Sequence, residues 1–145
     1  MKYEVIRDQF YECLDLTWDV INTQVEKEIQ NNTCRIIGND EEKTILLLDN
    51  ENFHPIISKM YAIMRYKYRL TTLHIYTSQN NAQTFGRHCD QSDVLIVQSI
   101  GKMSYKFDDG ELIVLKPGDG VYIPKGMYHD PIPIEPRVSL SFSWN

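Results

Sequence analysis

The stretch HCDQSDVLIVQ, residues 88–98, joins an imidazole and two carboxylates to a run of aliphatic residues. In a β-strand, side chains two positions apart point to the same face, so His88 and Asp90 should project together while Cys89 points away. Asp93 has the opposite parity to Asp90, which predicts a supporting residue rather than a partner of the pair. The aliphatic residues predict a buried strand, so the polar pair should lie at the edge of a core.

Around this stretch, from about residue 71 to residue 145, the hydrophobicity alternates with a period of two. Turn sequences such as Asp109-Gly110 and Lys116-Pro117 separate the alternating segments. Six or more short strands in about 75 residues predict an antiparallel barrel or a double-sheet jelly roll. The segments are LHIYT, DVLIVQS, KMSYKF, ELIVL, GVYIP and RVSLSFSW.

The first part of the chain has helical spacing instead. Apolar residues recur every three or four positions from Tyr3 to about Gln30, which predicts an amphipathic helix with a break near Asn22. A second helix is expected at about 52–68, with Asn52 as a candidate N-cap and Pro55 in the first turn.

Between the two helices, the apolar runs 35–37 and 44–48 flank a polar GNDEE turn, which predicts a small hairpin. We therefore expect a single domain of the mainly β, α+β class, residues 1–145. Residues 1–70 should form a helical cap with the hairpin, and residues 71–145 the barrel.

The composition limits the function classes. The chain has 145 residues, 42% of them hydrophobic, and a net charge of −5 without a long run of Lys or Arg, which argues against nucleic acid as a partner. Its three cysteines, Cys13, Cys34 and Cys89, lack CxxC spacing and favour a reducing, cytoplasmic compartment. An acidic N-terminus, and no apolar run near the ~18 residues of a membrane span, disfavour secretion and membrane insertion.

A second histidine motif follows in the run GDGVYIPKGMYH, residues 118–129, in which Pro124 and Gly126 shape a tight turn before His129. The pattern G-x5-P-x-G-x2-H resembles the second motif of the cupin superfamily. The first cupin motif has an H-x-H pair, and here His88-x-Asp90 replaces it. Two histidines and one carboxylate then remain, the facial triad that leaves three positions open on a non-haem Fe(II).

The stretches QTFGRHCDQSDVLIVQSIGK, LKPGDGVYIPKGMYH and SLSFSW occur in this order and resemble the JmjC-type cupin oxygenases, within them the ribosomal oxygenase-like group. The resemblance covers about residues 71–145. It implies a cupin jelly-roll fold and an Fe(II)- and 2-oxoglutarate-dependent hydroxylase. It also implies that His88, Asp90 and His129 are the metal ligands and catalytic residues.

The sequence departs from the family at the cosubstrate. A Lys or Arg fifteen residues after the first ligand histidine binds the distal carboxylate of 2-oxoglutarate in the family, and this position is Met103 here. Lys102 is adjacent but would point to the opposite face of a regular strand. A protonated His74, and Tyr76 with the same parity, are the predicted cosubstrate contacts.

Alternatives to this function stay open. The same ligands accept Mn, Co, Ni or Zn. Met103 favours a metal-cupin that acts as an isomerase, a lyase or a 2-oxoglutarate-independent enzyme, and a third hypothesis is a non-catalytic cupin that binds a small ligand. Expected partners are a small-molecule or peptide substrate, with a homodimer possible by analogy and no nucleic acid or membrane.

Several other residues have a structural interpretation. Burying a carboxylate with two imidazoles costs several kcal/mol when no metal or other partner is present. A cluster of polar side chains that only hydrogen-bond to one another is therefore the weaker interpretation of the triad. Arg87 and Arg137 could meet an acidic ligand but are by default solvated charges. His54 is expected to be a surface or capping residue. The strand aromatics are core residues by default, although they could line a pocket: Tyr76, Tyr105, Tyr122 and Phe142.

Overall fold

The computed structural model describes residues 2–38, 42–48, 51–69, 71–79, 82 and 84–145. Within these residues, antiparallel strands form a seven-stranded sheet, ordered β1-β8-β5-β10-β4-β3-β2, and a three-stranded sheet, ordered β7-β6-β9. The elements in chain order are β1 (Glu4–Ile6), the 3-10 helix η1 (Glu12–Asp15), α1 (Trp18–Asn31), β2 (Arg35–Ile37), β3 (Thr44–Leu48), α2 (Pro55–Lys67), β4 (Thr72–Ser78), β5 (Asp93–Ile100), β6 (Met103–Phe107), β7 (Leu112–Leu115), β8 (Gly120–Ile123), β9 (His129–Pro133) and β10 (Arg137–Trp144).

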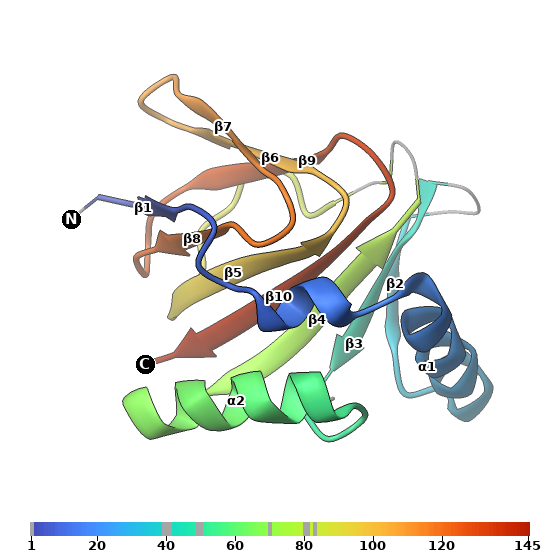
Figure 1. The fold of residues 1–145 in the computed structure, drawn as a ribbon. Helices are drawn as coiled ribbons and strands as arrows, with labels where there is room; N and C mark the ends of the chain where they lie inside the picture. Colours follow the sequence, from blue (N-terminus) through green and yellow to red (C-terminus); the bar gives the residue numbers. More distant parts are fainter. Residues whose placement is uncertain (1, 39–41, 49–50, 70, 80–81, 83) are drawn as a thin grey trace.

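The two sheets face each other and enclose the interior of a barrel (Figure 1). Ile96 of β5 and Val121 of β8 pack there against Tyr105 of β6 and Leu115 of β7. The period-two pattern produces this core because alternate side chains of each strand point inward. The jelly-roll cupin fold and the mainly β class are therefore confirmed.

A second core lies on the other face of the large sheet, where both helices pack (Figure 1). Ile21 of α1 and Ile57 of α2 are buried there with Leu47, Ile75 and Leu140 of the sheet. Each fully buried aliphatic side chain contributes roughly 1.5–3 kcal/mol. Residues of opposite parity on the same strands are thus available to face the barrel interior.

The predicted helix from Tyr3 to Gln30 is wrong over its first half. Residues 4–6 form β1, which pairs antiparallel with β8, and Asp8 has a positive φ of 54° that a helix does not allow. The α-helix begins only after Thr17, whose side chain accepts a hydrogen bond from the Val20 backbone N–H. Asn22, where a break was expected, lies inside α1.

The second helix occupies Pro55–Lys67, close to the predicted range, but its N-cap is His54 and not Asn52. The Nδ1 atom of His54 accepts a hydrogen bond from the Ile56 backbone N–H at 3.2 Å. Proline is favoured at the first helical position because it has no N–H to satisfy, so Pro55 fixes the start. The capping role expected of His54 is confirmed.

The predicted hairpin is present, with Arg35, Ile36 and Ile37 of β2 opposite Leu46, Ile45 and Thr44 of β3. Most of its GNDEE turn, residues 39–41, lies outside the described residues. β3 also pairs with β4, so the hairpin extends the large sheet. The first 48 residues therefore contribute strands to the sheet as well as helix, while the division into cap and barrel at residue 70 stays a prediction.

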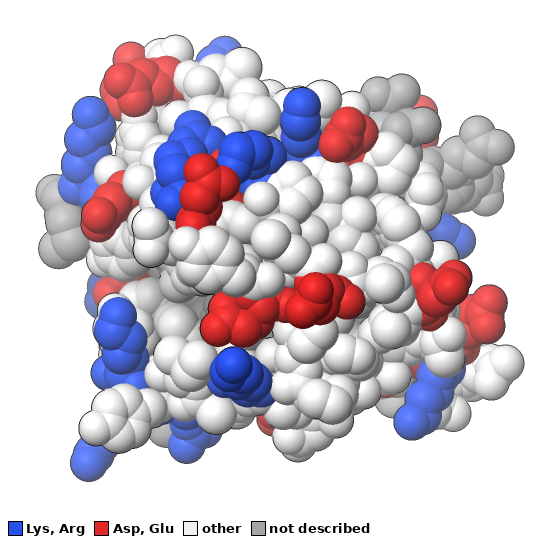
Figure 2. All heavy atoms as spheres, in the orientation of Figure 1, with Lys and Arg blue, Asp and Glu red and all other residues white. Residues whose placement is uncertain are grey.

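The surface in Figure 2 carries basic and acidic side chains interspersed. Arg7 and Lys116 both pair with the carboxylate of Asp119, which is buried. Of the helices described, none is long and apolar enough to cross a membrane.

Candidate metal centre

Backbone pairing between two distant segments brings His88 and His129 together. Each residue donates its backbone N–H to the carbonyl of the other, at 2.9 and 2.8 Å, in an isolated antiparallel bridge. His88 and Asp90 were expected on a continuous strand, but β5 begins only at Asp93. The bridge supplies the local extended geometry that the strand was expected to provide.

The turn before β9 is tied to the segment that carries Asp90. The Gly126 backbone N–H donates to the Asp90 carbonyl at 2.9 Å. The Lys125 N–H donates to the Asp93 carboxylate at 2.8 Å. Asp93 thus has the supporting role predicted from its parity: it holds the turn that leads into His129.

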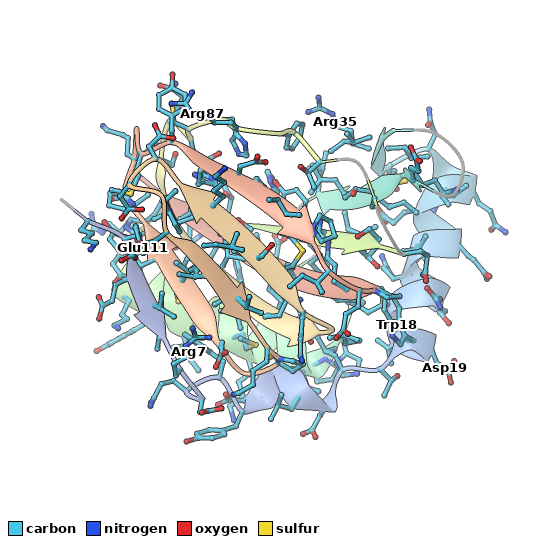
Figure 3. All side chains as sticks on the ribbon, turned by 90° about the horizontal axis from the view of Figure 1, so that it is seen from above. Arg7, Trp18, Asp19, Arg35, Arg87 and Glu111 are labelled. Atoms are coloured by element: carbon cyan, nitrogen blue, oxygen red, sulfur yellow. The ribbon has the colours of Figure 1, made fainter. Side chains whose placement is uncertain are left out.

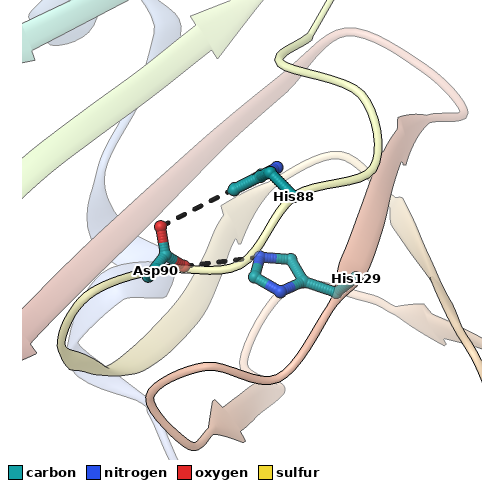
Figure 4. Close-up of side chains that lie close together, drawn as sticks. All are labelled: His88, Asp90 and His129. Carbon is teal, nitrogen blue, oxygen red and sulfur yellow. Dashed lines mark ion pairs between the residues drawn. The ribbon is translucent and has the colours of Figure 1, made fainter.

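The three side chains of the predicted triad converge (Figure 4). The Nε2 atom of His88 lies 3.7 Å from one carboxylate oxygen of Asp90, and the Nε2 atom of His129 lies 3.5 Å from the other. One ligand atom from each residue lies within 4.8 Å of the other two. Two ligands cis to each other about 2.1 Å from an ion are roughly 3 Å apart, so the two carboxylate-to-imidazole distances would shorten by less than about 1 Å on coordination.

Hydrogen bonds to the backbone orient both imidazoles. The Nδ1 atom of His88 lies 2.7 Å from the Gly86 carbonyl, and that of His129 lies 3.0 Å from the Met127 carbonyl. A carbonyl only accepts, so each Nδ1 carries the proton and each Nε2 presents its lone pair to the centre. Burial also lowers the pKa of His129, which keeps its imidazole neutral and able to bind a metal.

The chemistry of this donor set fits a divalent transition metal. Two neutral imidazoles and one carboxylate on one side of an ion are the ligands of non-haem Fe(II) oxygenases, with positions left open for exogenous ligands. The side chain of His129 is almost fully buried, whereas those of His88 and Asp90 are 28% and 37% exposed. An ion would thus be anchored from the barrel interior and open on one side.

The triad borders a cavity of about 50 Å³ between the two sheets. This volume exceeds the ~10–15 Å³ that one water requires. Tyr76 belongs to its lining, as predicted for a cosubstrate contact, whereas His74 does not. The described lining residues are Ile37, Thr44, Tyr76, Thr84, Phe85, His88, Asp90, Ile96, Tyr105, His129, Pro131, Arg137, Ser139 and Ser141.

His74 and the remaining aromatics lie elsewhere. His74 is half-buried on β4, opposite Ser141 of β10 and therefore farther along the same face as Tyr76. Phe142 belongs to the core under the helices, and Tyr122 packs against that core. Of the four strand aromatics, Tyr76 and Tyr105 thus line the cavity.

Arg137 is also in the cavity lining, and its interpretation as a solvated charge is wrong. The residue is 3% exposed. Its Nε donates to the Ser78 hydroxyl at 2.9 Å, its Nη1 donates to the Ser139 hydroxyl at 3.1 Å, and its guanidinium lies 5.5 Å from the Tyr76 ring. A detectable signal existed, because RVSLS puts Arg137, Ser139 and Ser141 on one strand face.

Tyr76 lies within electrostatic reach of Asp90 in the triad and of Arg137. Burial raises the pKa of its hydroxyl, the negative charge of Asp90 raises this pKa further, and the positive charge of Arg137 lowers it. The Tyr76 hydroxyl therefore interacts electrostatically with the triad and with the Arg137 guanidinium.

Met103 is fully buried in the barrel core beside Tyr105 and Phe107, and is absent from the described cavity lining. Lys102 is exposed, as its parity predicted. Neither residue therefore supplies a cation to the cavity.

The segment before His88 is held by cation–π contacts at the edge of the cavity. The guanidinium of Arg35 lies 5.3 Å from the ring of Phe85, which lines the cavity, and that of Arg87 lies 4.1 Å from the Tyr128 ring. Arg87 is exposed and pairs with Asp108, as expected of a solvated charge. Figure 3 shows Arg35 and Arg87 on the same edge of the molecule.

Known proteins share this fold. Residues 46–112 match the family model of the JmjC domain, a segment that includes His88 and Asp90 and ends before His129. YcfD, a ribosomal oxygenase from Escherichia coli, superposes with a TM-score of 0.76 at 19% identity, over 99% of this chain and 48% of YcfD. No curated protein matches the chain significantly in sequence.

A structure of YcfD in complex with cobalt and 2-oxoglutarate superposes with a TM-score of 0.64 at 25% identity, over 74% of this chain and 33% of YcfD. A cupin superfamily protein from Desulfitobacterium hafniense gives a TM-score of 0.54 at 13% identity, over 74% of this chain and 83% of that protein. The chain thus spans between a third and half of the length of the YcfD structures. The chain is therefore similar to JmjC-type cupins, in fold over most of its length and in sequence over the matched segment.

Proposed function

We propose that the chain is a metal-dependent oxygenase of the Fe(II)/2-oxoglutarate type, which hydroxylates a small molecule or a peptide side chain. The observation that carries this proposal is the convergence of His88, Asp90 and His129 at the border of a cavity. The fold shared with an oxygenase that binds cobalt and 2-oxoglutarate supports it.

In this proposal His88, Asp90 and His129 hold Fe(II) through two Nε2 atoms and one carboxylate. Bound Fe(II) would supply the oxidative chemistry, in which 2-oxoglutarate, O2 and a C–H bond give succinate, CO2 and a hydroxylated product. The backbone carbonyls of Gly86 and Met127 keep the two imidazoles in the required tautomer.

The cavity walls have two tasks in this mechanism. The apolar side chains of Phe85, Ile96 and Pro131 limit the access of water to the reacting groups. The Tyr76 hydroxyl, raised in pKa and therefore protonated, can donate a hydrogen bond to a carboxylate. His74 remains proposed as a further cosubstrate contact, from its place on the same strand face.

The second candidate is a metal-cupin that uses its ion as a Lewis acid or only binds a small ligand. Met103 favours it, because the residue that stands in the family's cation position is apolar and fully buried. Both candidates need the same three metal ligands, so they differ in whether 2-oxoglutarate is bound and consumed.

Succinate formation distinguishes these functions. We expect the chain, incubated in air with Fe(II), ascorbate and 2-oxoglutarate, to form succinate measurable by NMR. His88→Ala should lower the rate at least about 100-fold, as loss of a metal ligand does more than loss of an outer partner. His54→Ala, the same substitution at the N-cap of α2, should leave the rate unchanged. Bound metal without succinate would contradict the oxygenase and leave the second candidate.

A further inference from the structure

A buried cation without a carboxylate partner lies on the cavity wall. Arg137 is 3% exposed, and among the described residues no carboxylate lies within ion-pair distance of its guanidinium. Its two hydrogen bonds to Ser78 and Ser139 use Nε and Nη1. Two neutral hydroxyls do not neutralise a guanidinium, which stays protonated in proteins.

The energetics of this arrangement call for an anion. Removing an ion from water costs several kcal/mol even after relaxation, and hydroxyl partners recover only part of this cost. Burial accordingly lowers the pKa of Arg137. Because the residue belongs to the cavity lining, an anion that enters the cavity is the partner within reach.

A rigid support fixes the guanidinium in position. The Ser139 hydroxyl donates to Oε1 of Gln98 at 2.8 Å, so its oxygen is left to accept from Arg137. Nε2 of Gln98 in turn donates to the carbonyls of Ile100 and Gly101 at 2.9 and 3.0 Å. A chain of bonds therefore links the arginine to the turn between β5 and β6. Such second partners preorganise a binding group before its ligand arrives.

The same turn leads into Met103, at the start of β6. A Cβ atom on Gly101 would lie 1.9 Å from the Pro136 carbonyl oxygen and 3.2 Å from the Arg137 Cα, so the backbones of the β5–β6 turn and of the start of β10 touch. Arg137 thus reaches the cavity from the start of β10. This part of β10 packs against the turn that leads into Met103, the position where the cation of the family is missing.

We infer that Arg137 binds the distal carboxylate of 2-oxoglutarate, in place of the cation absent at Met103, while the 2-oxo acid end faces the triad. The assignment rests on the proposed function. It makes Arg137 the residue that selects a dicarboxylate over a 2-oxo acid with one carboxylate. A planar guanidinium can bind a carboxylate through two parallel hydrogen bonds, which a lysine cannot do.

The test compares two 2-oxo acids on the Mn(II)-loaded protein by calorimetry without turnover. 2-Oxobutyrate shares the metal-binding end of 2-oxoglutarate but lacks the distal carboxylate. We expect the wild-type chain to bind 2-oxoglutarate about 100-fold more tightly, the contribution of a charged hydrogen-bond pair. Arg137→Met should remove this preference and leave 2-oxobutyrate affinity within about two-fold. Arg65→Met, the same change at an exposed arginine of α2, should leave the preference unchanged.

Arg137→Lys keeps the charge and should retain part of the preference, so it serves as a second variant if Arg137→Met does not fold. A wild-type chain that binds both acids equally, or an Arg137→Met chain that keeps the preference, would overturn the assignment. Either result would still leave a metal-dependent 2-oxo acid site. Failure of the metal-loaded wild-type chain to bind either acid would instead refute the proposed function, and the assignment with it.

Discussion

Asp90→Ala is expected to lower the affinity for a divalent metal by more than about 100-fold, beyond the loss caused by removing an outer-shell partner. The carboxylate is the anionic member of the triad and lies within 3.7 Å of both imidazoles. Two neutral imidazoles remain in the variant, and they cannot compensate for the charge of the ion. Titration calorimetry with Mn(II) measures the affinity directly.

The matched control is Asp130→Ala, which removes a carboxylate next to His129 that does not belong to the triad. This variant should keep the affinity within a few-fold. A bound metal also raises the thermal midpoint by mass action, so the metal-dependent stabilisation should disappear in Asp90→Ala alone. Equal metal affinity in Asp90→Ala and the wild-type chain would contradict the assignment of the ligands.

Gly101→Ala is expected to lower the free energy of unfolding by about 3 kcal/mol or more, the sum of a left-handed backbone penalty and overpacking. Gly101 has a φ of +70°, and an added Cβ would lie 1.9 Å from the Pro136 carbonyl oxygen. The obstacle is backbone at the start of β10, so no flexible side chain can move aside. Denaturant unfolding measures the loss.

Gly110→Ala provides the comparison, because Gly110 has a similar positive φ of +89° and nothing within 4 Å of the added Cβ. It should cost only the backbone term of roughly 1–2 kcal/mol. If the two variants lose equal stability, the close approach of the β5–β6 turn to residues 136 and 137 is not present in solution.

The barrel could be predicted from the sequence because hydrophobicity alternates in most of its strands and its turns contain Gly, Pro and Asp. The meeting of His88, Asp90 and His129 followed from two motifs, and the structure brings the three together, although the continuous strand expected around His88 is a single bridge. That these residues bind a metal stays a prediction.

The N-terminal segment shows why local periodicity fails. Residues 4–6 fit a helical repeat, yet they pair with β8, a partner more than 110 residues away. The three-residue strand is too short to show a period of its own, so tertiary pairing decides its structure. The start of α1 could nevertheless be predicted from the sequence, because Thr17 is a good N-cap residue.

The burial of Arg137 escaped prediction for a different reason. An arginine at the start of a strand is most often solvated, and the sequence does not show that β4 and β10 pair so that Ser78 lies directly opposite. Only this register encloses the guanidinium between two hydroxyls. Position 103 therefore lacks the cation of the family, as the sequence indicates. Arg137, on another strand, nevertheless brings a cation to the cavity.

In our proposal the triad and Arg137 form one composite site for a metal ion and 2-oxoglutarate. The most direct test is reciprocal coupling, measured by titrating Mn(II) with and without 2-oxoglutarate, and 2-oxoglutarate with and without Mn(II). We expect each ligand to raise the affinity of the other by the same factor, at least about 10-fold. 2-Oxoglutarate that binds equally well with and without Mn(II), or not at all, would contradict it.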